Sequence, residues 1–452
     1  MGCGPGARGG NPRSHLCQQG SRIDGAGPGW RRLRVQLMTR LKTTPSIAAL
    51  TGALAALPAY AQSEADNTRV GYRYSHYSEA DLPAARAAGG GASERYEIRS
   101  HQIDLAQRLN ASWTLDAGLM IETMSGASPW FVMPGAQNGA PVQVMSGASI
   151  TEERYALNLK AQRDDQGMRR WAAQLGASDE DDYNSVSAGL SMELDTDQRR
   201  RTWSAGVGFS DDTLKPTDGG SATYPERIVR ASKQSWSAFA GVSQILSPQT
   251  VAQLSLAYGY DDGFLSDPYK LVFVNGQTEA DRRPDERHQW AFSARVRHYL
   301  ASMRSVLRAD WRHFRDDWDI HSDTVELGAW QRLTARLRLG LSARWYRQSQ
   351  AEFYAPYFEQ TPQNGLISSD YRLSPYGAVS WRGSVDYIGS RWAASLAIES
   401  YDSDEDYALR TVRVANPGLV DFSVISLAFS YSFGQSPVAP ATSEVQMVPL
   451  TP

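Results

Sequence analysis

The chain has 452 residues, of which 41% are hydrophobic and 21% are charged. Both cysteines, Cys3 and Cys17, precede the cleavage site described next, so a disulfide scaffold and thiolate sites for zinc or iron–sulfur clusters are excluded from the mature chain. Residues 1–61 hold 8 of the 46 basic and 1 of the 49 acidic residues, leaving 38 basic against 48 acidic, a formal charge of −10. This acidic balance argues against nucleic-acid binding, which requires a basic patch.

A signal peptide is predicted at residues 38–61. Met38 begins a short basic segment, an apolar run follows over 47–57, and Ala59-Tyr60-Ala61 forms a small-x-small cleavage site. The apolar run is shorter than the roughly 18 residues that a membrane-spanning helix needs. Residues 1–37 are rich in Gly, Arg and Pro and lack periodicity, and we expect them to be a mis-assigned extension. The sequence thus predicts an exported protein whose mature chain has no transmembrane helix.

From residue 69 onward, the chain divides into alternating segments of roughly ten to fifteen residues, as in strands of membrane barrels. The short breaks between segments fall at 110–111, 164–167, 195–198, 247–249, 301–303, 332–334 and 387–390. The long breaks, rich in Gly, Pro, Asp and Tyr, fall at 78–94, 125–149, 179–184, 211–232, 261–287, 316–323, 348–370 and 402–418. Their regular interleaving predicts about sixteen strands, with both ends of the barrel chain on the side of the short turns.

Each segment has one apolar and one polar face. In 336–346, leucines alternate with arginines and small residues, and in 424–433 apolar residues alternate mainly with serines. Tyr431 and Phe433, at the end of the last segment, resemble the C-terminal assembly signal of outer-membrane barrels. An exported soluble sandwich or propeller is the alternative, but neither needs so many strands without a fixed repeat. We therefore predict an all-β, closed antiparallel transmembrane β-barrel over 62–433, with short periplasmic turns and long extracellular loops.

Five strings near the predicted loops carry a resemblance to a known family. They are Ser125-Gly-Ala-Ser-Pro129, Glu180-Asp-Asp-Tyr-Asn-Ser185, Asp267-Pro-Tyr-Lys270, Arg283-Pro-Asp-Glu-Arg287 and Arg315-Asp-Asp-Trp-Asp-Ile-His-Ser-Asp-Thr324. In this order they resemble the outer-membrane family catalogued as domain of unknown function 3570, although that family more often has Gly where Asp319 stands and His where Asp323 stands. The resemblance implies an outer-membrane barrel without an assigned activity, and an association with envelope redox biology. The loop residues it marks are Ser125, Pro129, Asp182, Tyr183, Asp267, Pro268, Tyr269, Lys270, Arg283, Pro284, Asp285, Asp317, Trp318 and His321.

No catalytic residue, metal site or cofactor is predicted. Residues 321–323 read His-Ser-Asp, but neighbours on a strand point to opposite faces and so cannot form a triad. An acid–base pair of His321 with Asp317 or Asp285 remains open. The acidic loop tips contain no Asp-x-Asp-x-Asp-Gly loop, and we interpret them as solvated or bridged by divalent ions to lipopolysaccharide.

A strip of arginines is predicted to face the lumen on four adjacent strands. Its members are Arg295, Arg297, Arg308, Arg312, Arg336, Arg338 and Arg344, and the acids Asp310 and Glu326 lie on the same inward faces. Buried like charges must be paired or hydrated. The strip is therefore either a salt-bridged wall that stiffens the barrel or an electropositive surface that favours anions in a pore.

The leading hypothesis is an outer-membrane protein that passes or binds small polar solutes through its lumen. The alternatives are an outer-membrane enzyme with an acid–base site at the loop rim, and a docking barrel for a periplasmic, redox-related partner. The Pro- and Ser-containing tail 434–452 could serve such docking, and is otherwise expected to be disordered. The expected partners are membrane lipid, lipopolysaccharide and the barrel-assembly machinery, and not nucleic acid.

Overall fold

The computed structural model describes residues 68–89, 94–136, 139–146, 150–165, 167–409 and 411–433, so the predicted extension, signal peptide and tail lie outside the described residues. Within these ranges, sixteen strands form one closed barrel. In ring order they are β1 (Thr68–Glu79), β2 (Glu97–Arg108), β3 (Trp113–Gly126), β6 (Ile150–Asp164), β7 (Arg169–Glu180), β8 (Tyr183–Thr196), β9 (Arg201–Leu214), β10 (Ala231–Ser247), β11 (Thr250–Gly263), β14 (Glu286–Leu300), β15 (Ser305–Asp316), β16 (His321–Arg332), β17 (Leu337–Gln348), β18 (Tyr376–Ile388), β19 (Trp392–Asp404) and β20 (Phe422–Phe433).

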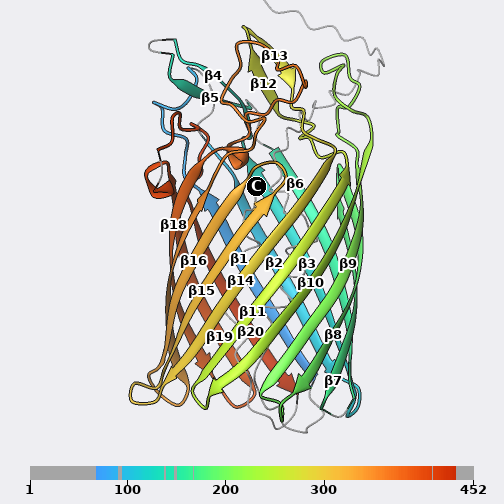
Figure 1. Ribbon diagram of the computed structural model, residues 1–452, viewed down its shortest axis with the longest axis vertical. Coiled ribbons are helices and arrows are strands. Elements are labelled where there is room, and N and C mark those ends of the chain that lie inside the picture. Colours follow the sequence, from blue (N-terminus) through green and yellow to red (C-terminus); the bar gives the residue numbers. More distant parts are fainter. Residues whose placement is uncertain are drawn as a thin grey trace, which may run out of the picture. The chain divides into compact units, whose positions relative to one another are not determined.

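Every barrel strand pairs antiparallel with its neighbours, and the first strand closes the ring against the last (Figure 1). The β1–β20 register runs from Thr68 opposite Phe433 to Glu79 opposite Phe422. Closure leaves no strand edge with unpaired backbone groups, which is the condition for strands to cross a bilayer. The predicted closed antiparallel barrel of about sixteen strands is confirmed.

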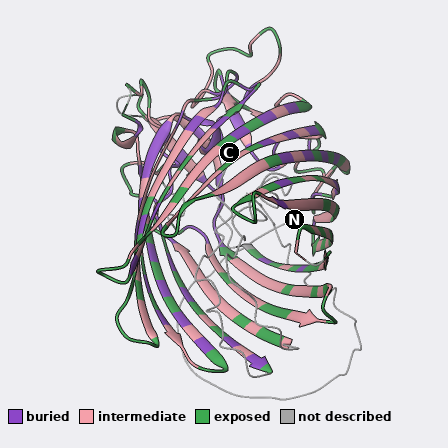
Figure 2. Ribbon diagram, turned by 60° about the horizontal axis from the view of Figure 1, so that its bottom comes forward, coloured by how far each residue is buried: buried purple, intermediate pink, exposed green. Residues whose placement is uncertain are grey.

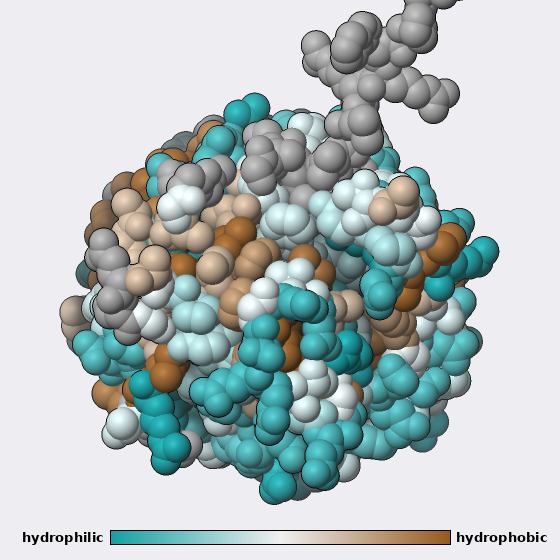
Figure 3. Space-filling model, turned by 90° about the horizontal axis from the view of Figure 1, so that it is seen from above, coloured by the Kyte–Doolittle hydropathy of each residue, from teal (hydrophilic) through white to brown (hydrophobic). Residues whose placement is uncertain are grey.

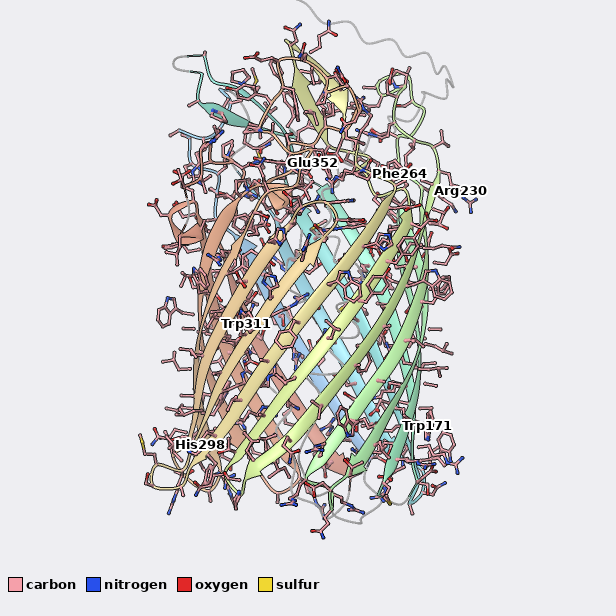
Figure 4. All side chains as sticks on the ribbon, viewed as in Figure 1. Trp171, Arg230, Phe264, His298, Trp311 and Glu352 are labelled. Carbon is pink, nitrogen blue, oxygen red and sulfur yellow. The ribbon has the colours of Figure 1, made fainter. Side chains whose placement is uncertain are left out.

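The outer surface of the barrel is apolar and the inner surface is polar. Along β17, Leu339 and Leu341 point outward and are exposed, while Ser342 points inward and is buried. Trp311 projects from the outer face of β15 (Figure 4), and Figure 2 shows exposed residues alternating with less exposed ones along the strands. Within the described ranges, no helix has the length and apolarity to cross a membrane.

The connections fall into two groups at the two ends of the barrel. At the turn end, β6 and β7 are joined through Gly167, whose φ of +98° a side chain would strain, and Trp171 and His298 lie near this end (Figure 4). At the loop end, two predicted long loops are short: β7 and β8 are joined by two residues, Asp181 and Asp182, and β15 and β16 by 317–320. At this end β7 and β15 extend beyond the apolar belt, and their outward residues there are polar. The sequence of these strand ends therefore resembles that of a loop.

A packed core lies at the loop end. The loops 264–285 and 349–375, called here the cap, contain the hairpin of β12 (Leu271–Val274) and β13 (Gln277–Ala280) and the short helix η1 (Tyr371–Leu373). In one cluster Trp318, Phe353 and Leu373 pack against inward residues of the barrel wall, and in another Ile367 packs against Val272. Figure 3 looks down on this end and shows side chains packed across much of the mouth. Phe264 and Glu352 lie where the cap meets the strands (Figure 4).

Other loops flank the cap. The loop 127–149 contains a hairpin of β4 (Pro129–Pro134) and β5 (Pro141–Met145), and the loop 405–421 contains the short helix η2 (Asp406–Ala408). The loop 215–230 ends at Arg230, which is labelled in Figure 4. These loops place polar and charged residues beside the cap.

Candidate functional site: the lumen wall and the cap

Five charged side chains form a continuous chain across the inner faces of β14–β17. Asp310 is ion-paired with Arg295 and, at 2.7 Å, with Arg308. Glu326 is ion-paired with Arg308 and, at 3.0 Å, with Arg344. The strand register places these residues opposite one another, Arg295 across from Asp310, which in turn lies across from Glu326. The side chain of Arg344 is 33% exposed, so this part of the wall is not covered by other side chains.

The remaining members of the predicted strip have different surroundings. Arg338 pairs at 2.9 Å with Asp386 of β18, an inward acid that was not predicted because it lies one strand beyond the predicted strip. Arg312 lies 5.9 Å from the ring centre of Phe314, and Arg297 is in register with Arg308. Arg336 differs from the prediction: β17 begins only at Leu337, so Arg336 is exposed in the turn and donates to the Tyr387 hydroxyl at 3.4 Å.

A second set of shared ion pairs lies on β3, β6, β7 and β8, where no site was predicted. Arg154 lies 3.2 Å from Glu122 and 3.5 Å from Glu180. Arg170 lies 2.7 Å from Glu193 and 2.8 Å from Asp195. The same alternation that identified the arginine strip places these residues inward, so the sequence did contain the signal.

A buried cluster of six charged residues lies within the cap. Arg372 is paired with Asp370 and, at 3.0 Å, with Asp267. Arg283 lies 2.7 Å from Asp281 and 2.8 Å from Asp370. The sixth member is Lys270, whose ammonium lies 3.9 Å from Asp370 and donates to the carbonyl of Pro129 at 3.1 Å. Because Asp370 and Asp281 are buried, these ion pairs have little solvent screening.

Burial and charge set the pKa values in this cluster. Burial alone would raise the pKa of Asp370, but the three surrounding cations outweigh burial and hold that pKa well below its ordinary value. Burial lowers the pKa of Lys270 despite the nearby carboxylate of Asp370. Burial also raises the pKa of Asp281, even with Arg283 beside it. The charged form of Asp370 is thus the strongly stabilised one at the centre of the cap.

The family-like strings meet around this cluster. The hydroxyl of Tyr269 donates to Asp182, which connects the 267–270 string to the 180–185 string. Arg287 is paired with Asp316, and the indole of Trp318 donates to the carbonyl of Glu286 at 3.0 Å. The residues of these sequence motifs therefore form hydrogen bonds and ion pairs between separate loops.

The other predicted loop and terminal residues lie at the edges of this arrangement. Pro268 accepts from Arg227 at 3.0 Å, Pro284 is half-buried, Tyr183 donates to Asp212, and Ser125 and Asp285 are exposed. Asp317 accepts from the backbone of His288, and His321 lies 3.5 Å from Asp319. Phe433 points outward with its ring edge against Tyr431, as both residues end β20.

Three carboxylates converge below Tyr269. Glu152, Glu180 and Asp182 bring oxygens within 4.8 Å of one another, and Glu152 and Asp182 are buried. This is the place in the described chain where oxygen ligands for a hard cation gather. Tyr269 already donates to one of the three.

The closed barrel, the apolar outer face and the charged inner wall define an integral outer-membrane β-barrel protein. The chain belongs to the family described as Protein of unknown function (DUF3570), which it matches over residues 43–433. The predicted family membership is confirmed. No curated protein sequence matched the chain.

Several solved outer-membrane structures are distantly similar. The siderophore receptor PirA from Acinetobacter baumannii has 9% identity and a TM-score of 0.40, with 76% of this chain and 54% of the receptor covered, so this chain spans about half the receptor's length. A loop L8 deletion mutant of OmpT from Vibrio cholerae has 8% identity and a TM-score of 0.39, with 82% and 100% covered. OccK5 (OpdH) from Pseudomonas aeruginosa has 8% identity and a TM-score of 0.39, with 83% and 99% covered.

Proposed function

We propose that this protein is an outer-membrane channel that passes or binds small polar solutes, with its long loops outside the cell and its short turns in the periplasm. The observation that carries the proposal is the partly exposed chain of charges from Arg295 to Arg344 on the lumen wall. Buried charges in a sealed interior would need complete pairing, whereas a water-filled lumen solvates them. Side chains along this wall keep part of their surface open to solvent.

The cap gives this channel a closed outer end. Its hydrophobic clusters and its six buried charges connect the loops 264–285 and 349–375 to each other and to the strand ends. Elements that open to admit a ligand have local stabilities below that of the whole fold. The cap is therefore the part of the molecule that must move for a solute to enter from outside.

Conductance across planar bilayers tests the channel directly. In the purified full-length protein, Thr324→Cys places a thiol on the inner face of β16, and Val325→Cys places one on the outer face of the same strand. A charged, water-soluble thiol reagent should reduce the current through Thr324→Cys and leave that through Val325→Cys unchanged. A wild-type protein that inserts but conducts no ions and admits no small solute would refute the proposal.

A further inference from the structure

The two sides of the lumen carry opposite excess charge. On β14–β17 two inward carboxylates, Asp310 and Glu326, are each shared by two arginines, as Asp310 is between Arg295 and Arg308. On β3, β6, β7 and β8 the inward Arg154 and Arg170 are each shared by two carboxylates, as Arg170 is between Glu193 and Asp195. Arginines are therefore in excess on one side of the lumen, and carboxylates are in excess on the other.

The other charges along the inward faces of these strands show the same contrast. The strands β14–β17 present Arg287, Arg295, Arg297, Arg308, Arg312, Arg338 and Arg344 against Asp310, Asp316 and Glu326. The strands β3, β6, β7 and β8 present Asp116, Glu122, Glu152, Glu180, Glu193 and Asp195 against Arg154, Lys160 and Arg170. The first group is predominantly basic and the second predominantly acidic.

The two groups lie on opposite sides of the barrel. In the closed ring, β3, β6, β7 and β8 occupy the third to sixth positions, and β14–β17 occupy the tenth to thirteenth. The electric field produced by these charges therefore points across the lumen, from the arginine side to the carboxylate side.

We propose that this transverse field makes the lumen selective for small zwitterionic solutes that carry one ammonium and one carboxylate group. The proposal rests on the channel function proposed above and specifies the solute class. A zwitterion lying across the lumen brings its carboxylate toward the arginines and its ammonium toward the glutamates, so both ends are attracted. A singly charged solute is attracted by one wall and repelled by the other, and a neutral solute of equal size has no net charge for the field to attract.

The charges on both walls are accessible to a solute. The side chain of Arg154 is 40% exposed, and those of Glu122 and Glu193 are each 25% exposed. On the opposite wall, Arg344 is exposed to a similar extent. Because these side chains are partly exposed in a low-dielectric wall, the field acts on the solute path and is weakened by salt.

Liposome swelling with two isomeric solutes tests the inference. The zwitterion 4-aminobutyrate and the neutral 4-hydroxybutyramide have the same atoms, so a difference in their entry rates reflects charge distribution and hydration rather than mass. At low salt we expect the wild type to admit the zwitterion faster by about twofold to fivefold. Glu122→Gln combined with Glu193→Gln should bring the ratio of rates down toward one.

The matched control is Arg338→Gln combined with Asp386→Asn. It removes one charge of each sign from a pair 2.9 Å apart, so it leaves the net charge of the lumen unchanged and should preserve the ratio. High salt applied to the wild type should lower the ratio without any substitution, which covers the case in which the glutamate variant fails to fold. Equal rates for the two isomers in a conducting wild type would overturn this inference alone, whereas a wild type that admits neither isomer would refute the channel itself.

Discussion

Replacing Asp370 by Asn should open the cap while leaving the barrel folded. Asp370 is fully buried between Arg283 and Arg372 and also accepts from the backbone N–H of Arg372 at 3.1 Å. Asn retains the shape and can still accept that backbone hydrogen bond, so the substitution removes mainly the charge. The three buried cations would then share only Asp267 and Asp281 within the cluster.

The expected cost follows from the burial of this cluster. Removing one partner of a buried ion pair typically costs about 3–5 kcal/mol, because a charge is left uncompensated. Since the barrel ladder does not pass through the cap, we expect this cost to fall on cap closure rather than on the barrel. A loss of 3 kcal/mol corresponds to roughly a hundredfold or greater rise in the open fraction of the cap.

The assay uses Ser368→Cys, a near-isosteric change at a fully buried position of the cap. The rate at which a water-soluble reagent labels this thiol reports how often the cap opens. The control is Glu279→Gln, which breaks a half-exposed pair with Arg282 on the same loop and should change the rate little. If Asp370→Asn labels no faster than its parent, the charge cluster does not hold the cap closed.

Three further predictions concern pH, orientation and processing. Because the pKa of Asp370 is depressed, its stabilisation of the cap is complete above its ordinary value of 3.8 and is lost as the pH falls below that value. The raised pKa of Asp281 works in the opposite direction and stabilises the cap further as the pH falls toward 3.8. Wild-type conductance should therefore not rise between about pH 8 and about pH 4, and should rise only below about pH 4. Cysteine labelling of intact cells should mark Asn364→Cys in the cap and miss Asp165→Cys in a turn, and the reverse pattern would invert the orientation. N-terminal sequencing of the membrane protein should begin at Gln62, and any earlier residue would contradict cleavage after Ala61.

The barrel could be predicted from sequence because its determinants are local. Alternation with a period of two places Leu339 outward and Arg338 inward whatever the neighbouring strands are. The turns could also be predicted locally, from the short polar segments between the alternating ones. Prediction failed where a strand continues beyond its apolar belt: Asp179 and Asn184 are hydrogen-bonded across paired strands, although both fell within a predicted loop. At such strand ends, polar residues indicate that the segment lies outside the apolar belt, but they do not indicate whether its backbone is a strand or a loop.

The cap could be predicted only in part, since its contacts join loops that are distant in sequence. The family-like strings contained Asp267, Lys270 and Arg283, but no pattern indicated that Lys270 and Arg283 meet at Asp370 or that Asp267 pairs with Arg372. The ion pair between Arg338 and Asp386 in the lumen was not predicted for a related reason. Arg338 reaches Asp386 through a strand register that the connecting loop of 349–375 does not reveal in the sequence.

The register also determines which arginine should control ion selectivity. Arg344 and Arg338 each have a carboxylate partner, so replacing either one leaves an acid that has lost a cation. Arg312 lies in register between Ser293 and Thr324, and within the described chain its guanidinium lies 5.9 Å from the ring centre of Phe314 and forms no ion pair with an acid.

Replacing Arg312 by Gln should therefore remove a positive charge without leaving a carboxylate unpaired. We expect a change in barrel stability within about 1 kcal/mol, because no buried ion pair is broken. The reversal potential in a salt gradient should shift toward cation selectivity, most strongly at low ionic strength, where screening is weakest. Arg344→Gln provides the comparison, since Arg308 remains beside Glu326 there. An unchanged reversal potential in a folded, conducting Arg312→Gln barrel would show that ions pass out of reach of this arginine.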